Sequence, residues 1–562
     1  MNYFWLIEYT FLMPIQFLKI KWRSFGPFSH FLITFLVLTP SAFFGFQNLH
    51  DGYVLMTSQF FKTSILEHNP YPFSQYGPLW SGFLGLLGVL SNSNWLLLAI
   101  RFMSIICYGI AIAFAVKILT LITKHPVSPL FSVLFAISWY YFEPSHGWPS
   151  TFILPLSLIA AFIVIKYFLE IRTSTFDALL VGFLIAIIQF TRLQVGVFLL
   201  VFYIFILVFF RRIHFGSIVL LGYSLTIICV IGILSYLRFF SDAFFDQVIM
   251  AANFHLNPER GSLRIPIWTI VIALVFTLFL IILSRKISTS VLIIYGLVGV
   301  LTIFSVIVST QILAPGEELY FLRWRILQRL YVGIILGLFV YSVIVSGILQ
   351  MKSKSHKKSR VLRYAPNFFL IATSAAVYSQ NYPLFSGHHS WYASLPIWVT
   401  SYLFINQKNK KLKRTLQTKL MLICVIFSLL LPSIWALQES KKSSRASINQ
   451  IVWVKGIQEN EFRELTNFAN TYIPLKSSLH NFCYEPLIFV VRPDIKPASR
   501  IFLWWERFEQ FPNYRTLAMQ KSDYALVCSR TASQINWLVE QSGWFVKAKS
   551  SKIGMVLYES KQ

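Results

Sequence analysis

The sequence predicts an all-α polytopic membrane protein with about thirteen transmembrane helices, followed by a small extracytoplasmic α/β domain at the C-terminal end. Three observations predict this fold class. Of 562 residues, 56% are hydrophobic and only 13% are charged, and the mean hydropathy is +0.62, a composition that soluble domains do not show. Apolar stretches long enough to cross a bilayer recur up to residue 437. Beyond that residue, strand-like and helix-like segments alternate.

The apolar stretches define the predicted spans. Their approximate ranges are 30–47, 95–121, 127–142, 149–168, 176–191, 194–210, 216–237, 266–283, 289–312, 330–349, 365–379, 392–405 and 418–437. They divide the chain into a cytoplasmic or interfacial N-terminal segment (1–29), a transmembrane domain (30–437) with a long first outside loop (48–94), and an outside domain (438–562). Residues 1–17 are apolar without a basic region or a cleavage site, so we expect an interfacial anchor helix or an additional span, and no signal peptide.

The net charge of +27 is a topology signal. Basic residues gather in alternate loops, most densely in 352–360 (KSKSHKKSR) and 408–414 (KNKKLKR), and these loops contain almost no acidic residues. Loops of this kind stay in the cytoplasm. We therefore expect a multi-pass protein of the plasma (inner) membrane, with a cytoplasmic N-terminus and an outside C-terminal domain. Nucleic-acid binding is the weaker interpretation of the charge.

The first outside loop holds the leading candidate functional residue. The loop is aromatic and apolar, and its proline-rich segment 69–80 (NPYPFSQYGPLW) prevents one continuous helix. We expect two short helices in the membrane interface, 52–65 and 79–90. Asp51 follows His50 where the chain leaves the first span. It either caps the next helix or acts as a carboxylate base at the lipid–water boundary, and one role does not exclude the other.

Other outside loops carry charges that topology does not require, so each of these charges needs a partner or a function. Arg192 stands alone between two apolar spans and suits a phosphate, although it could also be an interfacial anchor or a partner for Glu143. Arg323 and Arg325 are donor contacts or part of an interfacial belt. His388 and His389 lie in an aromatic loop that suits sugars or prenyl chains. A metal site from two adjacent histidines is disfavoured, and His146 near Glu143 keeps it open.

The order and sidedness of these motifs resemble a known superfamily. The motifs are Asp51 after the first span, YPFSQYGPLW (71–80), Arg101 opening the second span, YYFEPSHGW (140–148) and LVGFLIAIIQFTRLQVG (180–196). Together they are similar to the C-type (GT-C) membrane glycosyltransferases, in particular the protein O-mannosyltransferases and aminoarabinose transferases. Two motifs depart from that pattern: GPLW replaces a proline pair, and Glu143-Pro144 lacks the usual Asp. The departures leave the sugar and the acceptor unassigned.

The resemblance implies an inverting glycosyltransferase that moves a hexosyl or pentosyl group from a polyprenyl-phosphate donor to a glycan, lipid or protein acceptor. Asp51 would be the general base, and Glu143 would orient the acceptor or assist the base. The expected donor-phosphate ligands are Arg192, Arg323 and Arg325. The expected substrate contacts are His50, Tyr76, Trp80, His146, His388 and His389. No metal ligand is assigned and no cofactor is certain, while a divalent cation stays open.

Two other functions compete with this one. An O-antigen ligase or polymerase also uses lipid-linked sugars, but it depends on a dominant late outside loop, whereas the acidic residue here is in the first loop. A transporter or flippase of lipid-linked sugars would show internal symmetry and charges at mid-span depth. Neither feature is visible in the sequence.

The C-terminal region reads as a small α/β domain without a catalytic motif. A helix is predicted at 455–472 and another at 531–543, with strand-like runs around Cys483, around Cys528, at 544–549 and at 552–560. Three of the five cysteines lie in predicted spans, which leaves Cys483 and Cys528 outside the cytoplasm. They form either a disulfide or two buried free thiols, and the sequence favours neither.

Overall fold

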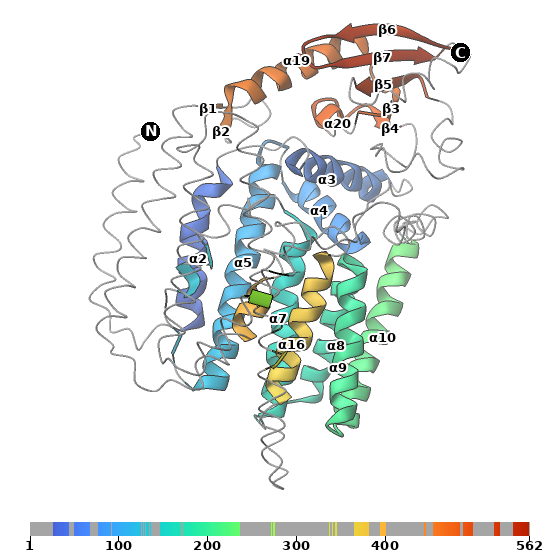
Figure 1. The fold of residues 1–562 in the computed structure, drawn as a ribbon. Helices are drawn as coiled ribbons and strands as arrows, with labels where there is room; N and C mark the ends of the chain where they lie inside the picture. Colours follow the sequence, from blue (N-terminus) through green and yellow to red (C-terminus); the bar gives the residue numbers. More distant parts are fainter. Residues whose placement is uncertain are drawn as a thin grey trace.

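The computed structural model has a bundle of upright helices and a smaller sheet at one end of the bundle (Figure 1). It describes residues 26–43, 50–67, 77–91, 93–124, 147–169, 173–236, 365–381, 394–400, 443–445, 453–483, 487–497, 522–528 and 543–560, with scattered positions at 126–136, 171, 271–275 and 337–344. The predicted spans 289–312 and 418–437, nearly all of 266–283 and 330–349, and parts of 30–47, 127–142 and 392–405 lie outside these ranges. The predicted helix at 531–543 lies almost entirely outside them as well.

The first predicted span begins earlier than expected. Helix α2 covers Pro27–Leu38 and continues as the 3-10 turn η2, Thr39–Ala42. Pro27 occupies the first helical position, where a missing N–H has no intrahelical partner to lose. Pro40 cannot donate the next helical hydrogen bond, so the α-helix ends at Leu38.

The other described helices of the bundle match predicted spans to within a few residues. They are α5 (Ser93–Thr123), α7 (Pro149–Phe168), α8 (Thr175–Thr191), α9 (Leu193–Phe209), α10 (Ile213–Tyr236) and α16 (Ala365–Tyr378). By length and composition, α5, α7 and α10 can each cross a membrane, and α8, α9 and α16 are shorter apolar helices. The described part of the chain is therefore mostly helical with three candidate spans, and the prediction of about thirteen spans stays a prediction.

Small residues and buried hydroxyls hold the bundle together. A Cβ added at Gly182 of α8 would overlap the backbone of α10, and one at Gly222 of α10 would overlap the backbone of α8. Glycines allow this close approach in apolar helix pairs. The hydroxyl of Tyr203 lies 2.7 Å from that of Thr373, which joins α9 to α16. Dispersion contacts and a few satisfied polar pairs thus fix the helices, as expected inside a membrane.

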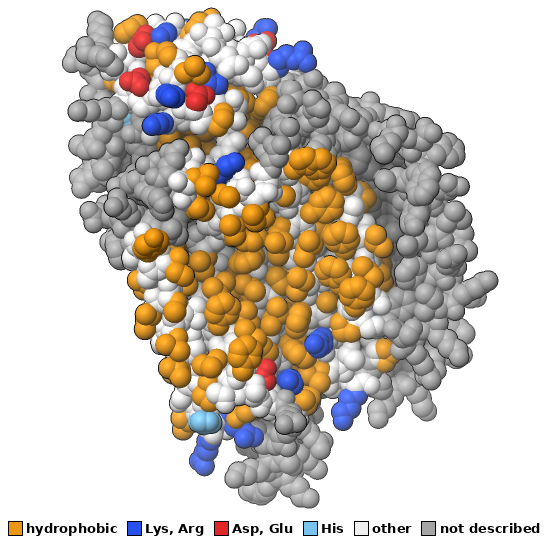
Figure 2. Space-filling model, turned by 180° about the vertical axis from the view of Figure 1, so that it is seen from behind, with side chains coloured by type: hydrophobic (Ala, Val, Ile, Leu, Met, Phe, Trp, Pro, Cys, Tyr) orange, Lys and Arg blue, Asp and Glu red, His pale blue; other side chains and the backbone are white. Residues whose placement is uncertain are grey.

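Charge distinguishes the two ends of the bundle. Its outer surface carries a broad band of apolar side chains, to which α9 and α10 contribute (Figure 2). Beyond the band, Lys and Arg side chains gather at the end away from the sheet (Figure 2). Lys166 lies in the last turn of α7, and Lys124, Arg211 and Arg212 lie on the connections that follow α5 and α9. The described basic connections therefore share one end of the bundle, as the sequence predicted.

The C-terminal elements form a mixed five-stranded sheet in the order β4-β3-β5-β7-β6. The strands are β3 (Ser478–Asn481), β4 (Lys496–Pro497), β5 (Tyr524–Cys528), β6 (Trp544–Ser550) and β7 (Met555–Ser560). β3 runs parallel to β4 and β5, whereas β7 is antiparallel to β5 and β6. Helices α19 (Gly456–Tyr472) and α20 (Leu487–Val491) flank this sheet, and an unexpected antiparallel pair, β1 (Ser443–Arg445) and β2 (Trp453–Lys455), precedes it.

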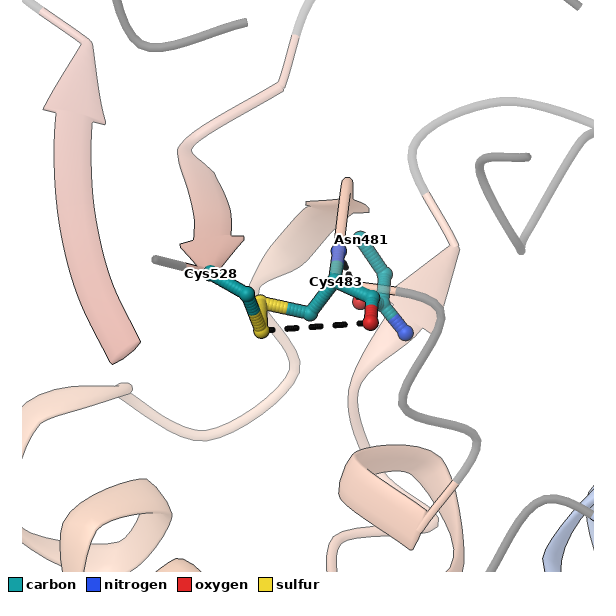
Figure 3. Close-up of a disulfide and its surroundings, with 3 residues drawn as sticks. All are labelled: Asn481, Cys483 and Cys528. Carbon is teal, nitrogen blue, oxygen red and sulfur yellow. Dashed lines mark hydrogen bonds between the residues drawn. A yellow bond between two sulfur atoms is a disulfide. The ribbon is translucent and has the colours of Figure 1, made fainter. Parts of the chain in front are cut away.

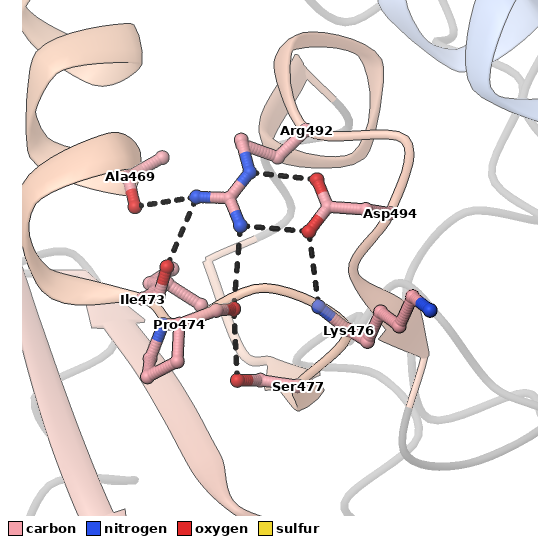
Figure 4. A network of polar contacts seen from close by, with 7 residues as sticks. All are labelled: Ala469, Ile473, Pro474, Lys476, Ser477, Arg492 and Asp494. Carbon is pink, nitrogen blue, oxygen red and sulfur yellow. Dashed lines mark hydrogen bonds and ion pairs between the residues drawn. The ribbon is translucent and has the colours of Figure 1, made fainter.

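Arg492 fastens the end of α19 to the segment after α20 (Figure 4). Its guanidinium donates to the carbonyl oxygens of Ala469 and Ile473 at 3.0 Å and of Pro474 at 3.2 Å. These acceptors include carbonyls that a helix end leaves unpaired. Asp494 accepts two further bonds from Arg492 at 2.7 Å, and these bonds lower the pKa of Asp494 to about 2.

Cys483 and Cys528 form a disulfide, with their Cα atoms 4.9 Å apart (Figure 3). β3 and β5 are parallel neighbours, so they end at the same edge of the sheet, where Cys528 is the last residue of β5 and Cys483 lies two residues after β3. Asn481 Oδ1 accepts a hydrogen bond from the Cys483 amide at 3.1 Å. The structure thus decides between the two alternatives that the sequence left open, in favour of the disulfide.

We expect Cys483→Ser to destabilise the sheet. The disulfide joins residues separated by 45 positions, and closing such a loop stabilises a fold by about 4 kcal/mol in the chain-entropy description. The measurement is chemical unfolding of the purified chain, followed by the rate at which protease cleaves the C-terminal region. Cys229→Ser is the control, because Cys229 is exposed and unbonded. Equal resistance of the two variants to unfolding would contradict the prediction.

The basic-loop rule also predicts which end of the bundle faces outward. In a background without Cys107, Cys229 and Cys424, Lys552→Cys should react with a membrane-impermeant maleimide in intact cells, and His214→Cys should react only after permeabilisation. Both positions are exposed, and they lie on the sheet and on the basic end respectively. The reverse labelling pattern would overturn the predicted orientation.

Candidate functional site

The two helices expected in the first outside loop are present. They are α3 (His50–Glu67) and α4 (Pro78–Leu90), and both lie between the upright helices and the sheet (Figure 1). However, α3 is not a surface helix in its first half. Residues 53–56 are each at most 4% exposed, and four successive helical residues point in all directions around the axis. The first half of α3 is therefore enclosed by protein, which the sequence did not predict, and its position in the membrane interface stays a prediction.

One side of α3 packs directly against the backbone of α4. A Cβ at Gly85 would overlap the side chain of Phe61, and one at Gly88 would overlap Ser58. The Ser58 hydroxyl donates to the carbonyl of Leu84. Because Gly85 and Gly88 have no side chains, the backbone of α4 lies directly against α3.

The sheet region encloses another side of α3. Residues 487–489 of α20 are at most 1% exposed, and the Phe489 ring packs edge-on against Phe60 of α3 at 5.2 Å between centroids. Residues 53–56 share one buried apolar cluster with Leu479, Leu526 and other residues of the sheet. The position of α3 consequently depends on residues more than 400 positions later in the chain.

Asp51 lies in the first turn of α3 and is paired with Arg101 of α5. Arg101 Nη2 donates to Asp51 Oδ2 at 2.9 Å, and both side chains are 1% exposed. Arg101 Nη1 also donates to the carbonyl of Ala42 at 2.9 Å. Because α3 begins at His50, Asp51 lies inside the helix, so the alternative that it caps a helix starting near Tyr53 is wrong. A buried charge pair of this kind is costly to disrupt from one side.

Trp80 connects Asp51's helix to the start of α7. Its ring stacks on Tyr53 with centroids 6.3 Å apart, and its Nε1 donates to the carbonyl of Gly147 at 3.0 Å. Gly147 has φ +67, and a Cβ there would overlap Ile100 of α5. Only glycine fits this position without strain. Trp80 was predicted as a substrate contact, and in the structure it is 2% exposed and holds three helices together.

Arg192 occupies the break between α8 and α9. Its backbone is extended, with φ −143 and ψ 95, and it is the N-cap residue of α9. Arg192 Nη2 donates to the hydroxyl of Ser150 in the first turn of α7 at 3.3 Å. The Gly77 amide, just before α4, donates to the carbonyl of Thr191 at 3.1 Å. The start of α4 therefore meets the end of α8 directly beside Arg192.

These contacts form one connected site at the end of the bundle that carries the sheet. The connection runs from Arg101 and Asp51 through Tyr53, Trp80 and Gly147 to the first turn of α7, where Ser150 meets Arg192. The predicted residues Asp51, Trp80 and Arg192 are thus brought into one region. Sequence reasoning recognised Arg101 as a charge that needed a partner but did not name Asp51 as that partner, and nothing in the sequence singled out Ser150.

The remaining predicted residues are not placed. His50 begins α3, but its side chain is not described. The other predicted residues outside the described ranges are Tyr76, Glu143, His146, Arg323, Arg325, His388 and His389. Within the ranges that are described, no three His, Cys, Asp or Glu side chains come together as metal ligands. Asp51 and Arg101 by themselves do not make a divalent-cation site.

Among known proteins, the chain is similar to solved structures of an archaeal oligosaccharyltransferase, AglB from Archaeoglobus fulgidus. The apo form has a TM-score of 0.48 and 11% identity, over 90% of this chain and 70% of that one. The complex with Zn and sulfate has a TM-score of 0.47 and 12% identity, over 95% and 73%. The complex with an inhibitory peptide and a dolichol-phosphate has 0.46 and 12%, over 95% and 74%. No protein-family model and no curated protein matches the chain.

The junction at Gly77 yields a testable prediction. A Cβ at Gly77 would overlap the carbonyl of Phe190, whereas one at Gly82 of the same loop region meets nothing within 4 Å. Alanine can adopt the Gly77 backbone conformation, φ −62 and ψ 152, without strain. Any loss of stability in Gly77→Ala therefore comes from the clash of the added Cβ with Phe190. We expect Gly77→Ala to destabilise the purified protein by about 1–3 kcal/mol, and Gly82→Ala to be neutral or stabilising. Equal thermal unfolding midpoints would contradict the described junction.

Proposed function

We propose that this chain is an inverting glycosyltransferase that moves a sugar from a polyprenyl-phosphate donor to an acceptor at the outer face of the membrane. The observation that carries the proposal is the buried Asp51–Arg101 pair, connected through Trp80 to Arg192 at one end of an apolar helical bundle. The motif order that resembles GT-C glycosyltransferases supports the same assignment. The donor would be a hexosyl or pentosyl lipid, and the acceptor a glycan, lipid or protein.

Arg192 is suited to the phosphate of the donor. The prenyl chain of such a donor stays in the bilayer, so its phosphate lies where apolar helices end. Arg192 follows the last residue of α8 and precedes α9, with the Ser150 hydroxyl beside it. A guanidinium offers planar, permanently charged donors for phosphate oxygens. In the proposed reaction it stabilises the polyprenyl phosphate that leaves.

Asp51 is the proposed general base. As the acceptor hydroxyl or amine attacks the anomeric carbon, its proton passes to the Asp51 carboxylate. The bond from that carbon to the phosphate oxygen breaks, and its electron pair leaves with the polyprenyl phosphate. Attack from the face opposite the phosphate inverts the anomeric configuration. Since Asp51 is 1% exposed, acceptor binding requires a movement that opens the first turn of α3.

The other predicted residues keep their assignments within this proposal. Glu143 orients the acceptor or assists the base. Arg323 and Arg325 are further donor contacts. The proposed contacts to the sugar or prenyl parts are His50, Tyr76, His146, His388 and His389. Trp80 is reassigned, because its indole N–H is already bonded to Gly147 and its ring is buried; it positions the site.

We expect Asp51→Asn to lower sugar transfer on the order of a hundredfold or more, the scale of a lost general base. The measurement compares two deletion strains, one carrying the wild-type gene and the other the Asp51→Asn gene. Mass spectrometry determines the envelope glycans of each strain. A second assay measures the release of undecaprenyl phosphate when their membranes are given undecaprenyl-phosphate-linked sugars. Near wild-type transfer by Asp51→Asn would refute the catalytic assignment.

A second variant separates catalysis from folding. Asp51→Asn removes the charge that pairs with the buried Arg101, which by itself destabilises. The double variant Asp51→Asn/Arg101→Gln removes both charges and should recover thermal stability while staying inactive. If transfer instead recovers together with stability, the pair is structural and Asp51 is not the base.

A further inference from the structure

We propose that Gln380 binds hydroxyl groups of a sugar beside Arg192. The inference rests on the proposed function, because it names the residue that recognises the sugar at the site whose phosphate ligand is Arg192. It is carried by a separate observation, namely the position and bonding of the Gln380 side chain.

The backbone around Gln380 is fixed against the start of α9. Ser379–Asn381 form the 3-10 turn η4 at the end of α16. Gln194 Nε2, in the first turn of α9, donates to the carbonyl of Ser379 at 3.0 Å. Gln194 is two residues after Arg192, and Ser379 is the residue before Gln380. The Gln194–Ser379 hydrogen bond therefore joins the turn that carries Gln380 to the start of α9, next to Arg192.

The side chain of Gln380 is buried with unsatisfied polar atoms. It is 3% exposed, and neither Nε2 nor Oε1 has a hydrogen-bond partner within the described part of the chain. Two half-buried glutamines of the neighbouring helices have protein partners: Gln189 Oε1 accepts from Tyr223 at 2.6 Å, and Gln194 Nε2 donates to Ser379. Gln59 of α3, also half-buried, has an Oε1 without a partner among the described residues, but only in Gln380 are both carboxamide atoms of one described glutamine in this position. A buried carboxamide is unfavourable unless both its donor and its acceptor are paired, and such a group in a native structure calls for a ligand or a water.

The chemistry of a carboxamide selects the kind of ligand. Its nitrogen only donates and its oxygen only accepts. A phosphodiester, as in a sugar-linked donor, or a fully ionised phosphate monoester offers only acceptors, so it would pair with Nε2 and leave Oε1 unsatisfied. A sugar hydroxyl both donates and accepts, so adjacent hydroxyls satisfy both atoms of Gln380. The phosphate thus belongs to Arg192 and the hydroxyls to Gln380.

The test measures ligand binding to the full-length protein in nanodiscs. The probes are undecaprenyl phosphate and undecaprenyl phosphate carrying mannose, glucose or galactose. Gln380→Met keeps the side-chain length and removes both polar atoms. Gln189→Met is the matched control, because it removes a carboxamide with a protein partner outside the proposed site.

We expect the wild-type protein to bind at least one hexosyl lipid about tenfold or more tightly than undecaprenyl phosphate, since a polar site discriminates strongly for its hydroxyl partner. Gln380→Met should lose this preference while its affinity for undecaprenyl phosphate and its unfolding midpoint stay unchanged. Gln189→Met should keep the preference and unfold at a lower temperature. A separate titration with methyl hexosides, added without lipid, distinguishes an acceptor sugar from the donor sugar. If wild-type protein binds a methyl hexoside and Gln380→Met does not, the hydroxyls that contact Gln380 belong to the acceptor.

A wild-type sugar preference in Gln380→Met would overturn the inference, because it shows that Gln380 does not contact the sugar. The unfolding midpoint of that variant then has two outcomes: if it is unchanged, the carboxamide has no ligand to lose, and if it drops like that of Gln189→Met, a water or a protein group satisfies the carboxamide. In both cases the proposed function survives, because the wild-type protein still selects the hexosyl lipid. If the wild-type protein binds neither lipid nor methyl hexoside, the proposed function fails and the inference fails with it.

Discussion

The ion pair between Asp51 and Arg101 is the constraint on which the site depends. Two charges that are 1% exposed can persist beside an apolar bundle only if each satisfies the other. Arg101 also bonds the carbonyl of Ala42 at the end of η2, so one guanidinium fixes η2, α3 and α5 relative to one another. A side chain on a loose loop could not hold a carboxylate at a constant depth, whereas this arrangement does.

Glycines determine how closely the remaining elements approach that pair. Gly85 and Gly88 let α4 lie against α3, Gly77 lets it lie against the end of α8, and Gly147 lets the chain pass Ile100. As a result, Trp80 reaches from α4 to the start of α7, and Arg192 reaches Ser150. The site is therefore shaped by backbone contacts as much as by its charged side chains.

Much of this fold is visible in the sequence, because apolar length and proline position are local signals. The bounds of α7, α8 and α9 differ from the predicted spans by at most one residue, and the strands around Cys483 and Cys528 are also where the pattern placed them. Pairings are less predictable. Arg101 was recognisable as a charge needing a partner, but its choice of Asp51 depends on how α3 and α5 cross. The enclosure of residues 53–56 was not predictable from local sequence, since their apolar character suits a lipid surface equally well, and the covering residues are far away in the chain.

The enclosure of α3 has a consequence for how the protein is made. Residues 53–56 emerge from the ribosome more than 400 residues before their partners around α20 and the sheet. Contacts between such distant segments form late, so these apolar faces of α3 reach their final packing only after the C-terminal region has been made and folded against them. The disulfide between Cys483 and Cys528 flanks the segment that leads into α20, which places an oxidation step close to the last assembly event. The packing of the helix that carries Asp51 is thereby linked to synthesis of the sheet, and a product truncated before α20 would leave that helix without part of its cover.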